Sequence, residues 1–209
     1  DFKSQGFLPE AVLNYIALLG WSCASGEEIF TLDELIKNFT IDRLNPAAAV
    51  FDVKKMRWIN QQHIRKLSHD KLWQEIKPFL DNANLNLPDD KSWQNKSLEL
   101  FAQNLEVLED ALELYTPLAE NTFEISDEAK DVLSWDKTKD VIQAWVNELN
   151  NLDKDFISAD EFAEILNTIK ATCEVKGKEL FMPIRVAIIG KPHGAELKML
   201  IPLLSKEVL

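Results

Sequence analysis

Helix start signals recur along the whole chain, and they limit the possible folds more than any other feature of the sequence. Thr31 with Glu34 and Ser158 with Glu161 each match a capping box, in which side chains and backbone N–H groups satisfy one another at a helix N-terminus. Apolar residues follow both boxes at spacings of three and four, which places them on one helix face. No sustained alternation of polar and apolar residues, the pattern of a strand, occurs between the turn signals. The chain is therefore predicted to be all-α.

Prolines and glycines suggest further helix boundaries. Pro9 suits the first turn of a helix that Gly20 would close in a left-handed conformation. The predicted buried face of this helix consists of Val12, Leu13, Ile16 and Leu19. One continuous helix is predicted for residues 97–115 and a short one for residues 183–189. Asp52, Ser126 and Asp136 are predicted to cap three more helices.

Cysteine usage and hydropathy narrow the class of protein. Cys23 and Cys173 are too few for a disulfide framework and lie 150 positions apart, so both are predicted to be buried, reduced thiols of an intracellular protein. No stretch approaches the roughly 20 consecutive apolar residues of a membrane-spanning helix. A membrane is therefore not expected as a partner.

The net charge of −12 is unevenly distributed along the chain. Residues 54–78 contain seven Lys/Arg against two Asp/Glu, and residues 170–209 contain seven against four. Residues 97–169 contain four Lys/Arg against eighteen Asp/Glu. Two interpretations stay open on charge alone: solvated faces of differing sign, or two basic surfaces that bind a nucleic acid while the acidic block repels it.

The usual sequence marks of catalysis and metal binding do not occur. The six glycines form no G-x-G-x-x-G pattern, and the three histidines lie in no nucleophile–histidine–acid order. No catalytic residue, no cofactor site and no metal site is predicted. The residues by themselves predict a helical binding module with two basic faces.

Long strings take the interpretation further, and they are more specific than any short motif. These strings are GFLPEAVLNYIALLGW at 6–21, FDVKKMRWINQQHIRKL at 51–67, KPFL at 77–80 and KGKELFMPIRVAIIGKPHGAEL at 176–197. Together they resemble the C-terminal half of bacterial-type glutamyl-tRNA synthetases, with closest resemblance to cyanobacterial or plastid members. The resemblance is strong at both ends and weak over residues 82–170.

The resemblance implies an architecture and a missing part. Residues 1–67 would be the end of a stem-contact region, and residues 68–117 and 118–209 would be two small helical bundles that form an anticodon-binding cage. The family's class I catalytic half, which uses ATP and Mg²⁺, would lie upstream of Asp1. The chain is therefore expected to contain no cofactor and to be inactive in aminoacylation alone.

The resemblance also implies roles for individual residues. Lys54, Lys55 and Arg57 would contact tRNA phosphates, and Arg65 matches a basic position on the tRNA-facing surface. Arg185 matches an arginine that reaches the anticodon, where its planar fork can hydrogen-bond or stack on a base. The segment that contains Lys191, His193 and Gly194 would hold the anticodon loop. Trp58 is expected to belong to the core.

One departure from the family pattern bears on specificity. Glutamate-specific members carry an arginine at the position of Asn104, where it reads the third anticodon base. Asn104 is shorter and uncharged, so it cannot make the arginine contacts. This suggests the hypothesis that the parent enzyme is non-discriminating and charges both tRNA-Glu and tRNA-Gln with glutamate. The alternative is that Asn104 is an exposed helix residue and another group reads the base.

The expected partners follow from the resemblance: tRNA-Glu, with tRNA-Gln under the non-discriminating hypothesis, and no DNA. The protein is expected to be a monomer in the cytoplasm or the plastid stroma. Two other functions stay open. The chain could be a helical protein-interaction module whose acidic centre binds a basic partner, or a synthetase paralogue that no longer charges tRNA.

Overall fold

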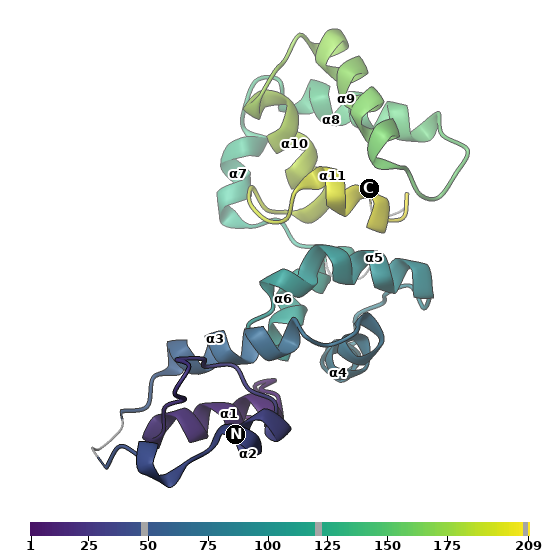
Figure 1. Cartoon of the computed structure of the whole chain (residues 1–209). Helices are drawn as coiled ribbons and strands as arrows, with labels where there is room; N and C mark the ends of the chain where they lie inside the picture. The colour runs from purple at the N-terminus through teal and green to yellow at the C-terminus, as the bar shows by residue number, and fades with distance from the viewer. Residues whose placement is uncertain (47–49, 120–122, 207–208) are drawn as a thin grey trace. The chain divides into compact units, whose positions relative to one another are not determined.

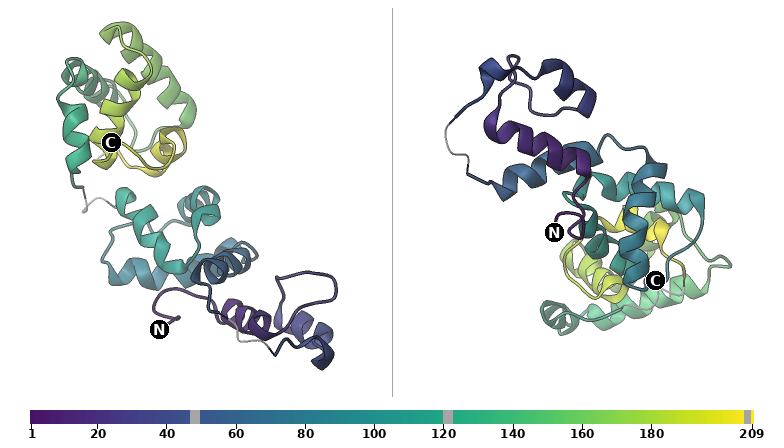
Figure 2. Two further views of the ribbon diagram at one scale, coloured as in Figure 1. Left: turned by 90° about the vertical axis from the view of Figure 1, so that its left-hand side faces the viewer. Right: turned by 90° about the horizontal axis from the view of Figure 1, so that it is seen from below.

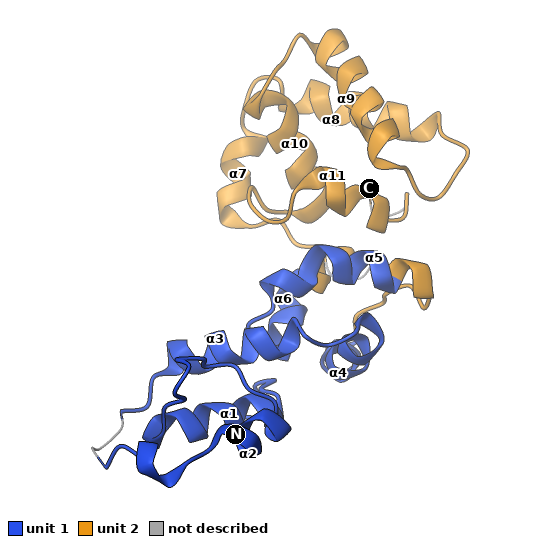
Figure 3. Ribbon diagram, in the orientation of Figure 1, with its two compact units in different colours: residues 1–84, 94–114 blue, residues 85–93, 115–209 orange. Residues whose placement is uncertain are grey.

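The computed structural model describes residues 1–46, 50–119, 123–206 and 209. Within these ranges the chain consists of α-helices joined by 3₁₀ turns and loops, and its one β-type pairing is an isolated bridge between Trp21 and Leu44. The prediction of an all-α fold is confirmed. The chain forms two compact units, which Figure 3 shows in different colours. Unit 1 comprises residues 1–84 and 94–114, and unit 2 comprises residues 85–93 and 115–209.

Unit 1 is built around the contact between its first helix and α3. Its helices are α1 (Pro9–Gly20), α2 (Leu32–Asn38), α3 (Val53–Ile64), α4 (His69–Asn82), most of α5 (Lys91–Phe101) and most of α6 (Ala111–Tyr115). Figures 1 and 2 show α1 lying along α3. Buried polar groups join the two helices to the loop between them: Asn14 accepts a hydrogen bond from the Phe30 N–H at 2.9 Å, and the Tyr15 hydroxyl accepts one from the Asp52 N–H at 2.6 Å.

Unit 2 is a bundle in which α10 contacts three other helices. Its helices are α7 (Asp127–Leu133), α8 (Thr138–Asn150), α9 (Ala159–Cys173), α10 (Lys178–Ile189) and α11 (Leu197–Leu200). In Figure 1, α10 lies between α7 and the pair α8 and α9. Trp145 on α8 is fully buried against Phe162 on α9, with the ring planes perpendicular and the centroids 5.8 Å apart, a favourable edge-to-face geometry. Burial of such large rings stabilises the bundle.

The predicted helix N-termini are confirmed where a side chain caps the backbone. The capping box of Thr31 begins α2, and the capping box of Ser158 begins α9. Asp52 caps α3 by accepting a hydrogen bond from the Lys55 N–H at 3.1 Å, and Ser126 caps α7. The prediction for Asp136 is wrong, since α8 begins after Lys137 and no side chain caps it. These signals are local, since donor and acceptor lie three residues apart.

The prediction for the C-terminus of α1 is wrong. Gly20 lies inside the helix, and the chain continues extended through Trp21 instead of turning left-handed. The Gly20 carbonyl oxygen accepts a hydrogen bond from the Asn45 N–H at 2.8 Å, which holds this extended exit. The short helix predicted for residues 183–189 is also longer, since α10 begins at Lys178 and contains Pro183.

The predicted buried face of α1 is wrong as well. Leu13 and Ile16 are 42% and 56% exposed, whereas Ala11, Asn14 and Tyr15 are buried. The hydrogen bonds of Asn14 and Tyr15 described above need this orientation. The helix therefore buries the hydrogen-bonded Asn14 and Tyr15 and leaves Leu13 and Ile16 exposed.

The single helix predicted for residues 97–115 is interrupted. After α5 ends at Phe101, the chain forms the 3₁₀ turns η2 (Ala102–Asn104) and η3 (Leu108–Asp110) before α6. Leu105, Val107 and Leu108 are all buried, at 0%, 2% and 4% exposure. An uninterrupted helix turns about 100° per residue and would point Leu105 and Val107 to opposite sides. The break lets all three side chains enter the core.

Two further predictions concern domains and thiols. Cys23 and Cys173 are free and buried, as predicted. The division into residues 1–67, 68–117 and 118–209 concerns subdomains of a family architecture and stays a prediction.

In the part of the chain that the structure describes, no helix has the length and hydropathy needed to cross a membrane.

Candidate nucleic-acid interface

The basic residues of unit 1 lie on α3, but they do not share one environment. Lys54 is exposed, and the structure gives it no ion pair among the described residues. The Lys55 ammonium group lies 2.5 Å from a carboxylate oxygen of Glu28, and both side chains are about two-fifths exposed, at 39% and 42%. Of Lys54 and Lys55, it is therefore Lys54 that a phosphate would contact without competition from a carboxylate.

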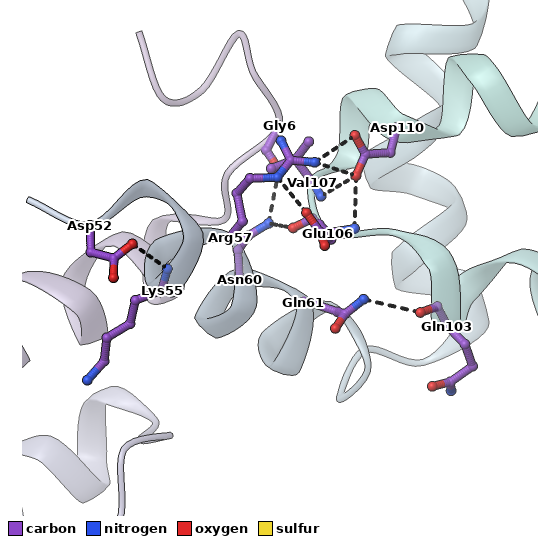
Figure 4. Close-up of polar contacts among 10 residues, drawn as sticks. All are labelled: Gly6, Asp52, Lys55, Arg57, Asn60, Gln61, Gln103, Glu106, Val107 and Asp110. Carbon is purple, nitrogen blue, oxygen red and sulfur yellow. Dashed lines mark hydrogen bonds and ion pairs between the residues drawn. The ribbon is translucent and has the colours of Figure 1, made fainter.

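Arg57 forms a cross-link within unit 1 (Figure 4). Its Nε donates a hydrogen bond to Glu106 at 2.5 Å, and its Nη2 donates to both carboxylate oxygens of Asp110 at 3.2 Å. The hydrogen bond with Glu106 and the charge of Asp110 raise the pKa of Arg57. Two carboxylates therefore offset the guanidinium charge. This arrangement gives Arg57 a structural role that the sequence did not indicate.

Asn60, three residues after Arg57 on α3, connects the segment around Glu106 to the residues that precede α1. Its Nδ2 donates to the Glu106 carbonyl oxygen at 2.7 Å, and its Oδ1 accepts from the Leu8 N–H at 2.8 Å. Asn60 is fully buried, so these bonds satisfy an amide that would otherwise be costly to bury. The Asp110 carboxylate in turn accepts from the N–H groups of Glu106 and Val107, both at 2.9 Å.

The last turn of α3 contacts the segment that carries Asn104. Gln61 Nε2 and Arg65 Nη2 both donate hydrogen bonds to the Gln103 carbonyl oxygen, at 3.2 and 3.0 Å. Asn104 is exposed, and its side chain makes no hydrogen bond to another described residue. The structure thus brings Arg65 and Asn104, two of the predicted site residues, to the same loop.

Side chains of α3 thus bind residues 102–110 at three points: the Gln103 carbonyl oxygen, Glu106 and Asp110. We call residues 102–110 the α3-anchored loop. Arg57, Asn60 and Gln61 on α3 and Arg65, the residue directly after α3, supply the side chains. Sequence reasoning did not single out Asn60 or Gln61. The available signal was the four-residue spacing of positions 57, 61 and 65, which places them on one side of a helix.

Arg185 is the central predicted residue of unit 2. It is half-buried on α10, and burial lowers the pKa of its guanidinium. Its Nη1 donates a hydrogen bond to the Ala195 carbonyl oxygen at 2.9 Å. No carboxylate pairs with it among the described residues. The guanidinium therefore keeps donors for a further acceptor while one donor holds the loop after α10.

Gly190 starts that loop and fixes its course. Its φ of +68° is left-handed, and a Cβ built on it would lie 1.9 Å from the Glu124 carbonyl oxygen. Its own carbonyl oxygen accepts a hydrogen bond from the Ser126 N–H at 2.9 Å. Only glycine fits this conformation and this close approach.

The other predicted residues of unit 2 follow Gly190. Lys191 and His193 are exposed, and the His193 Nε2 lies 3.2 Å from a carboxylate oxygen of Glu128. Gly194 has a φ of +132°, and the Arg185 Nη1 lies 3.6 Å from the position that a Cβ would take. Arg185 and the segment 190–195 therefore form one local arrangement.

Trp58 corrects the expectation of a core residue. Its side chain is 42% exposed on α3, four residues after Lys54. The buried positions of α3 are Met56, Ile59, Asn60, His63 and Ile64.

The described residues contain no group of three or more His, Cys, Asp or Glu side chains that could hold a metal ion.

Two family models match the chain. The model described as "Anticodon binding domain" matches residues 71–209, and the model described as "tRNA synthetases class I (E and Q), catalytic domain" matches residues 1–58. The first match covers all of unit 2 and the part of unit 1 that follows residue 70. The second covers α1, α2 and the first half of α3.

Curated relatives cover the chain from end to end. A glutamate–tRNA ligase of Bdellovibrio bacteriovorus is 48% identical over 209 residues, which is 100% of this chain and 43% of that protein. One from Geobacillus stearothermophilus is 37% identical over 99% of this chain and 43% of its own length. The chain thus spans less than half the length of these relatives. The expected closer likeness to cyanobacterial or plastid members stays a prediction.

A solved structure has the same fold. The crystal structure of a glutamate tRNA ligase from Elizabethkingia meningosepticum, in complex with its amino acid, aligns with a TM-score of 0.85 and 25% identity. The alignment covers 99% of this chain and 40% of the other.

Proposed function

The chain belongs to the glutamate–tRNA ligase family and carries its anticodon-binding domain, and from this we propose that it binds the anticodon arm of tRNA-Glu. The match of the anticodon-binding model over residues 71–209 is the observation that carries the proposal. The exposed basic groups, the α3-anchored loop and the segment 190–195 supply the chemistry. Phosphate contacts hold an RNA in place, and base contacts select its sequence.

Each part of the interface has a proposed role. Lys54 contributes affinity that depends on salt and is blind to sequence, since it contacts phosphates. Arg185 contacts an anticodon base with the donors that Ala195 leaves available. Lys191, His193 and Gly194 contact the anticodon loop. Lys55 and Arg57 stay proposed phosphate contacts, but a phosphate must compete there with carboxylates.

A gel-shift experiment tests this function on the chain as it stands. The chain is titrated against tRNA-Glu and against an unrelated tRNA at several salt concentrations. We expect tighter binding of tRNA-Glu and a linear fall of log affinity with log salt concentration. Absence of binding, together with capture of a basic protein partner, would favour the protein-interaction module instead.

We further propose that the parent enzyme accepts both tRNA-Glu and tRNA-Gln. Asn104 is exposed, and its amide can both donate and accept, so it can hydrogen-bond more than one base edge. Equal glutamylation of the two tRNAs by the full-length enzyme is the expected result. A preference above about a hundredfold for tRNA-Glu, a difference of roughly 2.7 kcal/mol, would contradict it.

Aminoacylation with ATP and Mg²⁺ is proposed for the whole ligase and not for this chain. The chain spans 43% of the length of its Bdellovibrio relative, and the class I catalytic-domain model matches only residues 1–58. The chain alone is expected to transfer no glutamate. Glutamylation by the full-length protein also separates a ligase from a paralogue that no longer charges tRNA. A monomeric state and a location in the cytoplasm or plastid stroma remain part of the proposal.

A further inference from the structure

A side chain of α3 and the side chain that directly follows α3 share one backbone acceptor in the α3-anchored loop. Gln61 and Arg65 lie four residues apart, one helical turn, and both donate to the Gln103 carbonyl oxygen, at 3.2 and 3.0 Å. A carbonyl oxygen has two lone pairs, so the two donors can occupy it together. Figure 4 shows Gln61 pointing from α3 to this carbonyl group.

The shared carbonyl belongs to the peptide that leads directly into Asn104. Because a peptide unit is planar, fixing its C=O also fixes the direction of the Asn104 N–H and restricts the position of its Cα. The loop has a second anchor on the other side of Asn104, where Asn60 donates to the Glu106 carbonyl oxygen at 2.7 Å. Asn104 is therefore held from both sides while its own amide remains exposed.

We propose that Gln61 and Arg65 are positioning residues, which fix the Gln103–Asn104 peptide so that the Asn104 amide meets the third anticodon base in one orientation. This inference rests on the proposed function. It changes the role of Arg65 from a basic position on the tRNA-facing surface to a group that acts through Asn104. It also assigns a role to Gln61, which carries no charge and would not be expected to attract an RNA backbone.

An uncharged positioning residue can be separated from a phosphate contact by experiment. The binding of the chain is measured for two anticodon-arm hairpins, one complete and one abasic at the third anticodon position. The ratio of their dissociation constants gives the contribution of that base and cancels any effect on backbone contacts. For the unmodified chain we expect a ratio of about five, the size expected for one net hydrogen bond.

Gln61→Ala is expected to lower this ratio to below about two, because the Gln103 carbonyl oxygen then keeps only the Arg65 donor and the amide of Asn104 is held less firmly toward the base. The slope of log affinity against log salt concentration should stay unchanged, since no charge is removed. Gln61→Glu, which keeps the size but removes the donor, should lower the ratio equally. Gln62→Ala is the matched control, because Gln62 is its neighbour on α3 and makes no hydrogen bond to another described residue. Unfolding midpoints of all variants show that they are folded.

Asn104→Ala separates the inference from the proposed function. If Asn104→Ala abolishes the base contribution and both Gln61 variants do not change it, the positioning role is wrong and the reading of the base by Asn104 stands. If Asn104→Ala leaves the ratio at its original value, the proposed reading of the base fails, and the positioning role fails with it. A loss in all three variants, with no further loss in the double variant of Gln61 and Asn104, supports the inference.

Discussion

His63 on α3 lies with its Nε2 2.9 Å from the Oδ1 of Asn14 on α1, inside the core of unit 1. An amide oxygen only accepts hydrogen bonds, so the Nε2 carries a proton and donates. The same Oδ1 also accepts from the Phe30 N–H. This contact joins the two helices at a position where the imidazole is only 7% exposed.

Burial, aided by the charge of Lys66, lowers the pKa of His63 below its usual 6.5. The unfolded chain therefore binds more protons than the folded chain, and stability is lost as the pH falls below about 6.5. We expect the unfolding free energy in urea to decrease between pH 7 and pH 5 by more in the unmodified protein than in His63→Gln, since glutamine keeps a donor for Asn14. His193→Gln is the control, because His193 is 70% exposed. If His63→Gln and the unmodified protein had identical pH profiles, the loss of stability at low pH would not come from His63.

Arg57→Ala tests the cross-link between α3 and the α3-anchored loop. Its ion pairs are partly exposed, so each contributes at most about 1 kcal/mol, and the variant should lose about 1–2 kcal/mol of unfolding free energy. Lys54→Ala, which breaks no ion pair among the described residues, should change stability by less than about 0.5 kcal/mol. Urea unfolding of both variants measures the difference. Equal stability would mean that the contacts with Glu106 and Asp110 contribute nothing.

Lys54→Ala is expected to affect RNA binding more than Arg57→Ala does, which is the reverse of their effects on stability. Lys54→Ala is expected to weaken binding of all tRNAs alike and to reduce the salt slope by about 1, the change for one lost phosphate contact. Arg57→Ala should reduce the slope less, because Glu106 and Asp110 already offset its charge. Salt titrations of both variants provide the check. A larger slope change in Arg57→Ala would restore Arg57 as the principal phosphate contact.

Gly190→Ala tests the course of the loop after α10. A Cβ there would meet the Glu124 carbonyl oxygen at 1.9 Å, and the left-handed backbone adds strain, so a loss of about 2 kcal/mol or more is expected. Gly20→Ala is the contrasting variant: Gly20 is helical with no atom within 4 Å of the added methyl group, and alanine should stabilise by about 0.5–1 kcal/mol. Thermal unfolding distinguishes them. A neutral Gly190→Ala would show that Glu124 does not approach this closely.

The local parts of the fold could be predicted from the sequence. Caps such as Thr31 and Ser158 involve groups three residues apart, so the sequence contains both partners. The break after Phe101 could not be predicted in this way, because it depends on Arg57 and Asn60, more than forty residues away. Helical spacing in 97–115 is satisfied equally well by a continuous helix, and only the tertiary contacts select the interrupted form.

The candidate interface was predictable in its residue types but not in their environments. The resemblance indicated Lys55, Arg57 and Arg65 as basic positions, whereas their partners Glu28, Glu106 and Gln103 became visible only in the structure. Arg185 differs, since its bond to the Ala195 carbonyl lies within one helix–loop segment, ten residues apart. Trp58 shows the same limit: its type favours burial, but its position on α3 leaves it 42% exposed.

Recognition of the anticodon by the chain can be measured in a single comparison. The dissociation constant of the chain is measured for tRNA-Glu and for the same tRNA with only its three anticodon nucleotides replaced, in the unmodified protein and in Arg185→Ala. We expect that replacement weakens binding by at least about tenfold, the equivalent of 1.4 kcal/mol, and that Arg185→Ala removes most of this difference. Equal affinity of the unmodified chain for both tRNAs would contradict it.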